Sequence, residues 1–379
     1  MNSLIKSIKN NAILYISGLL AFISCFIIRP DKSYIGYINV RVLSILFCLM
    51  LLVAALVRIG TFDLLTGKLL KRIRTLRGIS LLLTILSFFL SMFLTNDVTL
   101  VTLVPFAIMV MTPFEKPKEL MYTLIIMKVA ANLGSMQTPI GNPQNLYLYD
   151  NYGIPLPSFL LLMLPYSAFS LVITIALVFI LVRDNKPLTE ASGRDLKPLP
   201  IPKLLIYIAL FILNILTVAG YVHFLISLIA TAVLILIIDR KSFKNVDYQL
   251  LLTFIFFFVL IGNIGRIDLI TSKLSGLVSG YPVLAAILSS QVISNVPAAM
   301  LLSAFTDDGK SLVIGTNLGG LGTIIASMAS LITYKFHSAL SYKHSISSKK
   351  GKQGNYLASF TLINIVTLAL LFGLYMVLR

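Results

Sequence analysis

Long uncharged runs of apolar residues constrain this chain more than any other feature. Of the 379 residues, 58% are hydrophobic and 12% are charged. A helix rises about 1.5 Å per residue, so about 20 apolar residues cross the ~30 Å hydrocarbon layer of a bilayer. The sequence therefore predicts an all-α polytopic membrane protein that has the lipid bilayer as a partner. The clearest runs are residues 11–28, 42–57, 158–182, 204–222, 311–334 and 353–378.

The basic residues predict the orientation of the chain. They give it a net charge of +17, and most of them lie in alternate loops between the apolar runs. By the positive-inside rule these loops face the cytoplasm, so we expect no nucleic-acid partner. This predicts a multi-pass protein of a prokaryotic cytoplasmic (inner) membrane, with its N-terminus in the cytoplasm and its C-terminus outside. The basic loops are residues 6–9, 58–77, 116–118, 183–203, 240–244 and 335–352.

A polar triplet, Thr95-Asn96-Asp97, divides an apolar segment whose two ends lie in predicted cytoplasmic loops. Residues 78–112 are therefore predicted to form a helical hairpin with a polar tip. Its arms are long enough either to cross the bilayer or to stop inside it as a re-entrant hairpin. Both arrangements keep the same loop orientation, so the residues alone leave the choice open.

The next apolar run, residues 119–150, is interrupted midway by a polar stretch from Asn132 to Asn145. Two prolines and two glycines weaken a helix there, and its amide side chains would be costly against lipid. Unwound backbone at membrane depth is tolerated where protein or a water-filled cavity surrounds it. The stretch therefore predicts a discontinuous helix that lines a binding site.

The second half of the chain repeats this plan. Residues 270–306 hold a second polar tip at Ser294-Asn295, and residues 311–334 form a second interrupted run. Residues 132–146 align with 317–331, which pairs Thr138 with Thr323 and Asn145 with Ser330. The basic loops place the ends of the first hairpin in the cytoplasm and those of the second hairpin outside, which predicts two inverted repeats, 58–182 and 204–379. N-terminal scaffold helices (1–57) precede these repeats, and a cytoplasmic linker (183–203) joins them.

Interrupted helices supply ion-binding groups, because half-helix N-termini attract anions and unwound carbonyls attract cations. The alternative is that the polar residues only satisfy one another at the breaks. Asp97 is the sharpest candidate, since a carboxylate inside a membrane marks an ion path, a proton relay, a paired charge or a helix cap. The candidate substrate- or ion-binding residues are Thr95, Asn96, Asp97, Asn132, Gly134, Thr138, Gly141, Asn142, Asn145, Ser294, Asn295, Asn317, Gly319, Thr323, Ser327 and Ser330.

Lys128 is the other charged residue predicted inside the membrane. It lies four residues before Asn132 and so shares its helical face. It is either a charge partner for Asp97 or for an anionic substrate, or it extends to the cytoplasmic edge. The sequence contains no catalytic, nucleotide-binding or metal-binding motif. We therefore expect no enzymatic activity and no cofactor or metal, apart from a coupling sodium ion or proton.

Three segments resemble the ion transporter superfamily, which includes arsenite permeases, sodium/proton antiporters and divalent-anion/sodium symporters. They are residues 93–98, 138–145 and 289–297, and they look closest to uncharacterised bacterial inner-membrane permeases of the arsenite-permease-like branch. The resemblance implies re-entrant hairpins, elevator-like movement against a scaffold, and a homodimer. The sequence departs from the dicarboxylate branch, in which both hairpin tips read Ser-Asn-Thr, because its own tips read Thr-Asn-Asp and Ser-Asn-Val.

These observations predict a secondary transporter of a small anion, coupled to protons or sodium, with arsenite-type oxyanions as one candidate substrate. A sodium/proton antiporter without an anion substrate is the first alternative, and a citrate or dicarboxylate permease is another. A channel or a non-transporting membrane scaffold with the same fold is a further alternative.

Overall fold

The computed structural model describes residues 12–62, 64–65, 73, 75–184, 198–267, 275–276, 278–345 and 352–379. Several predicted features lie wholly or partly outside these residues. They are the cytoplasmic N-terminus, part of the basic loop 58–77, residues 185–197 of the linker, residues 270–274 and 277 of the second hairpin, and residues 346–351 of the basic loop 335–352. The division into domains stays a prediction.

The elements of the described chain are all helical, which confirms the predicted fold class. The α-helices are α2 (Ala12–Ile27), α3 (Ser33–Tyr37), α4 (Val40–Arg58), α6 (Leu76–Leu94), α7 (Asn96–Met111), α8 (Pro117–Gly134), α9 (Pro143–Asn151), α10 (Leu156–Leu181), α11 (Ile201–Val218), α12 (Phe224–Asp239), α13 (Tyr248–Ile264), α15 (Pro282–Ile293), α16 (Asn295–Leu302), α17 (Gly309–Gly319), α18 (Met328–Ser345) and α19 (Lys352–Leu378). Short 3-10 helices are η1 (Thr112–Phe114), η2 (Ser135–Gln137) and η3 (Arg240–Asn245).

Six segments of the described chain are long and apolar enough to cross a membrane. They include both arms of the first hairpin, whereas the arms of the second hairpin are shorter. The spans are Val40–Arg58, Leu76–Leu94, Asn96–Phe114, Leu156–Leu181, Ile201–Val218 and Tyr356–Leu378. The protein is therefore a multi-pass membrane protein.

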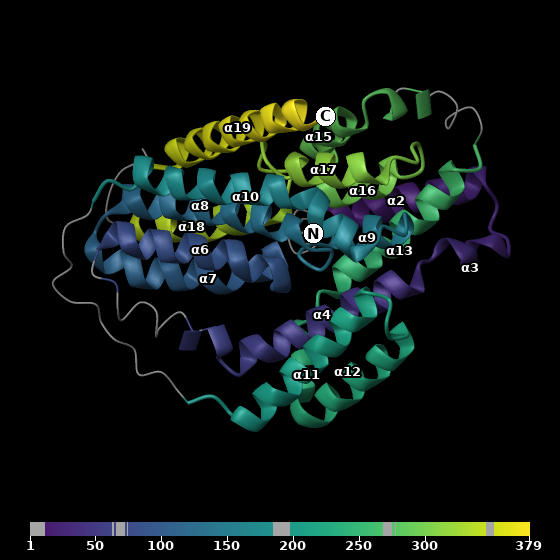
Figure 1. The fold of residues 1–379 in the computed structure, drawn as a ribbon, viewed down its shortest axis with the longest axis horizontal. Helices are drawn as coiled ribbons and strands as arrows, with labels where there is room; N and C mark the ends of the chain where they lie inside the picture. The colour runs from purple at the N-terminus through teal and green to yellow at the C-terminus, as the bar shows by residue number, and fades with distance from the viewer. Residues whose placement is uncertain are drawn as a thin grey trace.

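Small polar residues draw α6 against α8. Ser80, Thr84, Ser87 and Ser91 recur every three or four residues along α6, so they share one face, and all four are buried. Small side chains let helix backbones approach closely inside a membrane, where apolar contacts alone provide little driving force. The hydroxyl oxygens of Ser80 and Thr123 of α8 lie 2.5 Å apart across this interface. Figure 1 shows α6, α7 and α8 side by side in one bundle with α10 and α18.

A second group of helices, α4, α11 and α12, packs around an apolar cluster that includes Leu51, Leu52 and Tyr207, and also Leu94 at the end of α6. Figure 1 shows this group beside the bundle of α6 and α7, and α4 contacts α6 through this cluster. Polar contacts tie α11 to α12, including a hydrogen bond of 3.0 Å from Asn214 Nδ2 to Thr231 Oγ1. The outer faces of α11 and α12 expose large apolar side chains, as expected of helices that meet lipid.

Both predicted helix interruptions are present. α8 ends at Gly134 and α9 begins at Pro143, while α17 ends at Gly319 and α18 begins at Met328. Each break follows a hairpin, α6–α7 in the first half and α15–α16 in the second. The inversion of one half relative to the other, and the depth of the hairpin tips in the bilayer, stay predictions.

Candidate functional site

The two hairpin tips adopt the same unusual backbone conformation. Thr95 has φ 72° and ψ 149°, and Ser294 has φ 73° and ψ 155°. Positive φ is rare for residues with a side chain and costs about 1 to 3 kcal/mol, so it persists only where surrounding contacts impose it. Each tip thus ends one helical arm abruptly and starts the next arm at an asparagine, Asn96 or Asn295.

Matching hydrogen bonds hold each tip to the helix break of its own half. The backbone N–H of Asn96 donates to Gly141 O at 3.2 Å, and that of Asn295 donates to Ala326 O at 3.0 Å. Gly141 and Ala326 occupy equivalent positions when Asn132 is aligned with Asn317. Tip and break therefore form one unit, and the two halves build it in the same way.

Two equivalent threonines of the breaks make matching hydrogen bonds to the helical arm that precedes each tip. Thr138 Oγ1 donates to the carbonyl oxygen of Met92, and Thr323 Oγ1 donates to that of Gln291 at 3.1 Å. These are the threonines that the sequence alignment pairs. The surroundings differ, because Thr138 is half-buried whereas Thr323 is exposed.

Equivalent glycines permit the close approach of arm and break. A Cβ on Gly134 would lie 2.0 Å from Phe88 O and 2.7 Å from Ser91 Oγ. A Cβ on Gly319 would lie 2.5 Å from Ser290 Oγ, in the corresponding arm of the second hairpin. No side chain fits at either position without a shift of its neighbours.

Amide side chains join the first break to the end of α17. Asn142 Nδ2 donates to Asn317 Oδ1 at 3.0 Å, and Asn317 Nδ2 donates to Asn145 Oδ1 at 2.6 Å. All three side chains are buried. These residues lie more than 170 positions apart in the sequence, so the structure brings the polar segments of both halves together. Asn132 adds a longer contact of 3.5 Å from Nδ2 to Asn317 O.

The backbone carbonyl groups of the two breaks accept hydrogen bonds from different side chains. In the first break, Asn145 Nδ2 donates to Met136 O at 3.3 Å and to Thr138 O at 3.1 Å. Its counterpart Ser330 is too short for this role. In the second break, Gln291 Nε2 from the hairpin arm donates to Gly319 O and Leu321 O, at 2.9 Å each.

Several buried polar atoms in this region have no hydrogen-bond partner within the described residues. Asp97 Oδ1, Asn295 Nδ2 and Ser330 Oγ are among them, and so is Thr99 Oγ1. An unpaired buried polar atom costs about 1 to 3 kcal/mol, so such groups call for a ligand or a water. One acceptor at the first tip and one donor at the second are thus available to a bound ion.

Lys128 is buried in α8 and contacts the second half. Its Nζ donates to Asn364 Oδ1 at 2.8 Å and to Gly320 O at 3.1 Å. None of the ion pairs among the described residues includes Lys128 or Asp97. The side chain therefore neither pairs with Asp97 nor extends to a loop.

The predicted site residues thus fall into two sets. Residues that hydrogen-bond one another or permit close packing form the framework, and they include Asn132, Gly134, Thr138, Gly141, Asn142, Asn145, Asn317 and Gly319. Residues at the tips and at the start of α18 retain unpaired polar atoms. Ser327 is buried and its carbonyl accepts from Ser330 N at 3.0 Å. Sequence reasoning missed Gln291 and Asn364, because single amides in apolar helices give no local signal for their partners.

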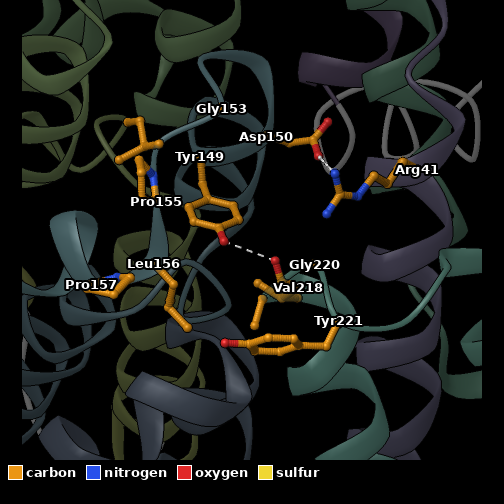
Figure 2. A pocket seen from close by; sticks show the side chains of 12 residues that line it. Arg41, Tyr149, Asp150, Gly153, Pro155, Leu156, Pro157, Val218, Gly220 and Tyr221 are labelled. Atoms are coloured by element: carbon orange, nitrogen blue, oxygen red, sulfur yellow. Dashed lines mark hydrogen bonds and ion pairs between the residues drawn. The ribbon is translucent and has the colours of Figure 1, made fainter.

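A hollow on the described chain lies away from this region. It measures about 400 Å³ and opens where the end of α9 meets the turn between α11 and α12. Figure 2 shows Arg41 paired with Asp150, N to O 3.1 Å, and the Tyr149 hydroxyl directed at Val218 O, 3.0 Å away. Arg41 is 41% exposed, so this ion pair contributes at most about 1 kcal/mol. The hollow thus lies beside the ion pair that joins α4 to the end of α9, and its lining includes none of the predicted site residues.

Removal of the Asn317 side-chain amide tests the hydrogen-bonded framework that joins the two halves. Asn317→Ala leaves Asn145 Oδ1 buried without a partner and removes one of the two acceptors of Asn142 Nδ2, which keeps Ser135 Oγ at 3.2 Å. We therefore expect a loss of about 1 to 3 kcal/mol of stability. The measurement is thermal unfolding of the purified protein in detergent, with Asn142→Ala and the double variant completing a cycle. We expect the two losses to be strongly non-additive. Additive losses would contradict the bridge between the halves.

Comparison with known proteins places these features in a family. The family model described as citrate transporter matches residues 4–308. An uncharacterized transporter of Methanocaldococcus jannaschii is 33% identical over 324 residues, which cover 85% of this chain and 88% of that protein. The inner membrane protein YbiR of Escherichia coli is 30% identical over 316 residues, which cover 83% of this chain and 84% of that protein.

A third relative matches a shorter segment. The silicon efflux transporter of Oryza sativa subsp. japonica is 32% identical over 148 residues, or 39% of this chain and 30% of that protein. The broad matches confirm the resemblance to the ion transporter superfamily and make the protein a membrane transporter. The chain belongs to the citrate transporter family.

Proposed function

We propose that the protein is a secondary active transporter that moves a small anion across the cytoplasmic membrane, coupled to protons or sodium. The observation that carries this proposal is the amide bridge from Asn142 through Asn317 to Asn145, which joins the two helix interruptions. Paired interruptions of this kind offer helix N-termini to anions and unwound carbonyls to cations. The hairpin tips, each held to the break of its own half by a backbone hydrogen bond, supply the unpaired Asp97 Oδ1 and Asn295 Nδ2.

The charge at the first tip favours a small substrate of low charge. A carboxylate repels a polyanion such as citrate at close range, and a low-dielectric environment strengthens that repulsion. An arsenite-type oxyanion fits better, because its hydroxyl groups can donate to Asp97 and its oxygens can accept from Asn295. The relative named for silicon efflux supports another small hydroxylated substrate.

Two alternatives have observations of their own. The unpaired Asp97 Oδ1 also suits a sodium/proton antiporter in which no anion binds. Citrate or dicarboxylate transport has the family's description in its favour.

For movement, we propose that the hairpins and breaks travel as an elevator against α4, α11 and α12, which pack on one another around an apolar cluster that includes Leu51 and Tyr207. The exposed apolar faces of the scaffold suit a homodimer as well as lipid.

Flux into proteoliposomes tests the proposal. The panel is arsenite, silicic acid, phosphate and citrate, each under an imposed proton gradient and an imposed sodium gradient. We expect saturable uptake of one small oxyanion, counterflow, and acceleration by one of the two gradients. Sodium-driven proton movement without any added anion would establish the antiporter instead. Flux that neither saturates nor shows counterflow would contradict secondary transport.

A further inference from the structure

The side chain of Lys128 occupies a position with the chemistry of a cation site. It is fully buried, and Nζ meets two neutral oxygens and the face of the Phe360 ring, whose centroid lies 5.1 Å away. Gly320 O lies directly after the end of α17, where helix carbonyls carry partial negative charge. Backbone carbonyls at half-helix ends are the groups with which transporters bind sodium, and ring faces attract cations.

The rest of the second break explains why this carbonyl is left for a cation. Gln291 already satisfies Gly319 O and Leu321 O on either side of Gly320. In the first break Asn145 serves several carbonyls, but its counterpart Ser330 leaves its own Oγ unpaired. Gly320 O thus receives its donor from α8 of the other half.

The two halves are not equivalent at this position. When Asn132 is aligned with Asn317, the counterpart of Lys128 is Val313, which is buried and apolar. The chain therefore delivers an ammonium group to the second break and none to the first. At the first tip, the acidic Asp97 remains without a basic partner among the described residues.

We propose that the ammonium group of Lys128 is a built-in cation that takes the place of a free ion at the second helix break, so that free sodium does not bind there. The consequence of this inference for ion coupling rests on the proposed transport function. Whether this position binds a cation can be tested without any measurement of transport.

Lys128→Ala removes the ammonium group and leaves Gly320 O, Asn364 Oδ1 and the Phe360 ring in place. Thermal unfolding of the purified variant is measured with n-propylammonium, with sodium and with tetramethylammonium, which has no N–H donor. We expect n-propylammonium or sodium to raise the midpoint for the variant by about 3 °C or more, and tetramethylammonium to leave it unchanged. For the unmodified protein we expect no shift of this size from n-propylammonium.

Two further variants separate a cation site from a simple cavity. Val313→Ala opens a cavity of its own at the equivalent position, and we expect no cation response from it. Lys128→Ala combined with Asn364→Ala removes one oxygen ligand, so we expect the response of the single variant to be lost. Should the alanine variant not be recovered as folded protein, Lys128→Ser is measured in the same way.

A folded Lys128→Ala or Lys128→Ser protein whose midpoint responds to neither cation would overturn the inference. That result would leave the transport proposal standing, since flux is measured on the unmodified protein. Conversely, an absence of flux in the unmodified protein would remove the transport proposal. A cation response of the Lys128 variant would still identify a cation site at the second helix break.

Discussion

Asp97→Asn is expected to reduce coupled flux about ten- to hundredfold. Asparagine keeps the shape of the side chain and removes its negative charge, so the protein should fold while the charge-assisted contact to a cation, a proton or a hydroxylated substrate is lost. Such a contact contributes about 1.5 to 3 kcal/mol, which corresponds to that range. The unpaired Asp97 Oδ1 is the structural reason for this expectation.

The measurement is initial flux in proteoliposomes under the gradient that drives the unmodified protein. Asp307→Asn is the matched control, because Asp307 is an exposed carboxylate in the turn before α17 and should leave flux unchanged. Full coupled flux in Asp97→Asn, with the same proton or sodium dependence, would remove the role assigned to this carboxylate.

Gly134→Ala is expected to destabilise the protein by about 3 kcal/mol or more. The added methyl group would lie 2.0 Å from the backbone oxygen of Phe88, so α6 and α8 would have to separate. Overpacking commonly costs about 1 to 3 kcal/mol, and a backbone atom cannot turn aside as a flexible side chain can. Because Gly134 ends α8 at the first break, we also expect the displaced break to lose transport.

Thermal unfolding in detergent measures this effect, with an expected fall in the midpoint of about 5 °C or more. Gly373→Ala is the control, since a Cβ there meets no atom within 4 Å and alanine favours the helix. An unchanged midpoint for Gly134→Ala would show that α6 and α8 are not in the close contact described.

Much of the fold follows from the sequence because membrane helices are local. Each needs about 20 apolar residues, and a stretch of amides, glycines and prolines exposes polar groups that are costly against lipid. The break after Gly134 and the turn at Thr95 were both predictable on these grounds. The alignment of Thr138 with Thr323 anticipates two contacts that the structure forms in the same way.

The bonding within the site could not be predicted, because it depends on contacts between distant segments. Nothing local in the sequence indicates that Asn317 joins Asn142 to Asn145, or that Gln291 serves the second break. Lys128 shows the same limit. Its partner Asn364 lies 236 residues away on α19, and only the packing of α8, α17 and α19 brings the two together.

A cryo-electron microscopy map of the protein in lipid nanodiscs, recorded with the ion that carries flux, tests the central claim most directly. The account predicts that both helix breaks face the protein interior near the middle of the bilayer, with the amide bridge from Asn142 to Asn317 intact. It also predicts density for the ion beside Asp97 and Asn295. A map in which either break lies against lipid, or in which Asp97 lies in bulk water far from the second tip, would contradict it.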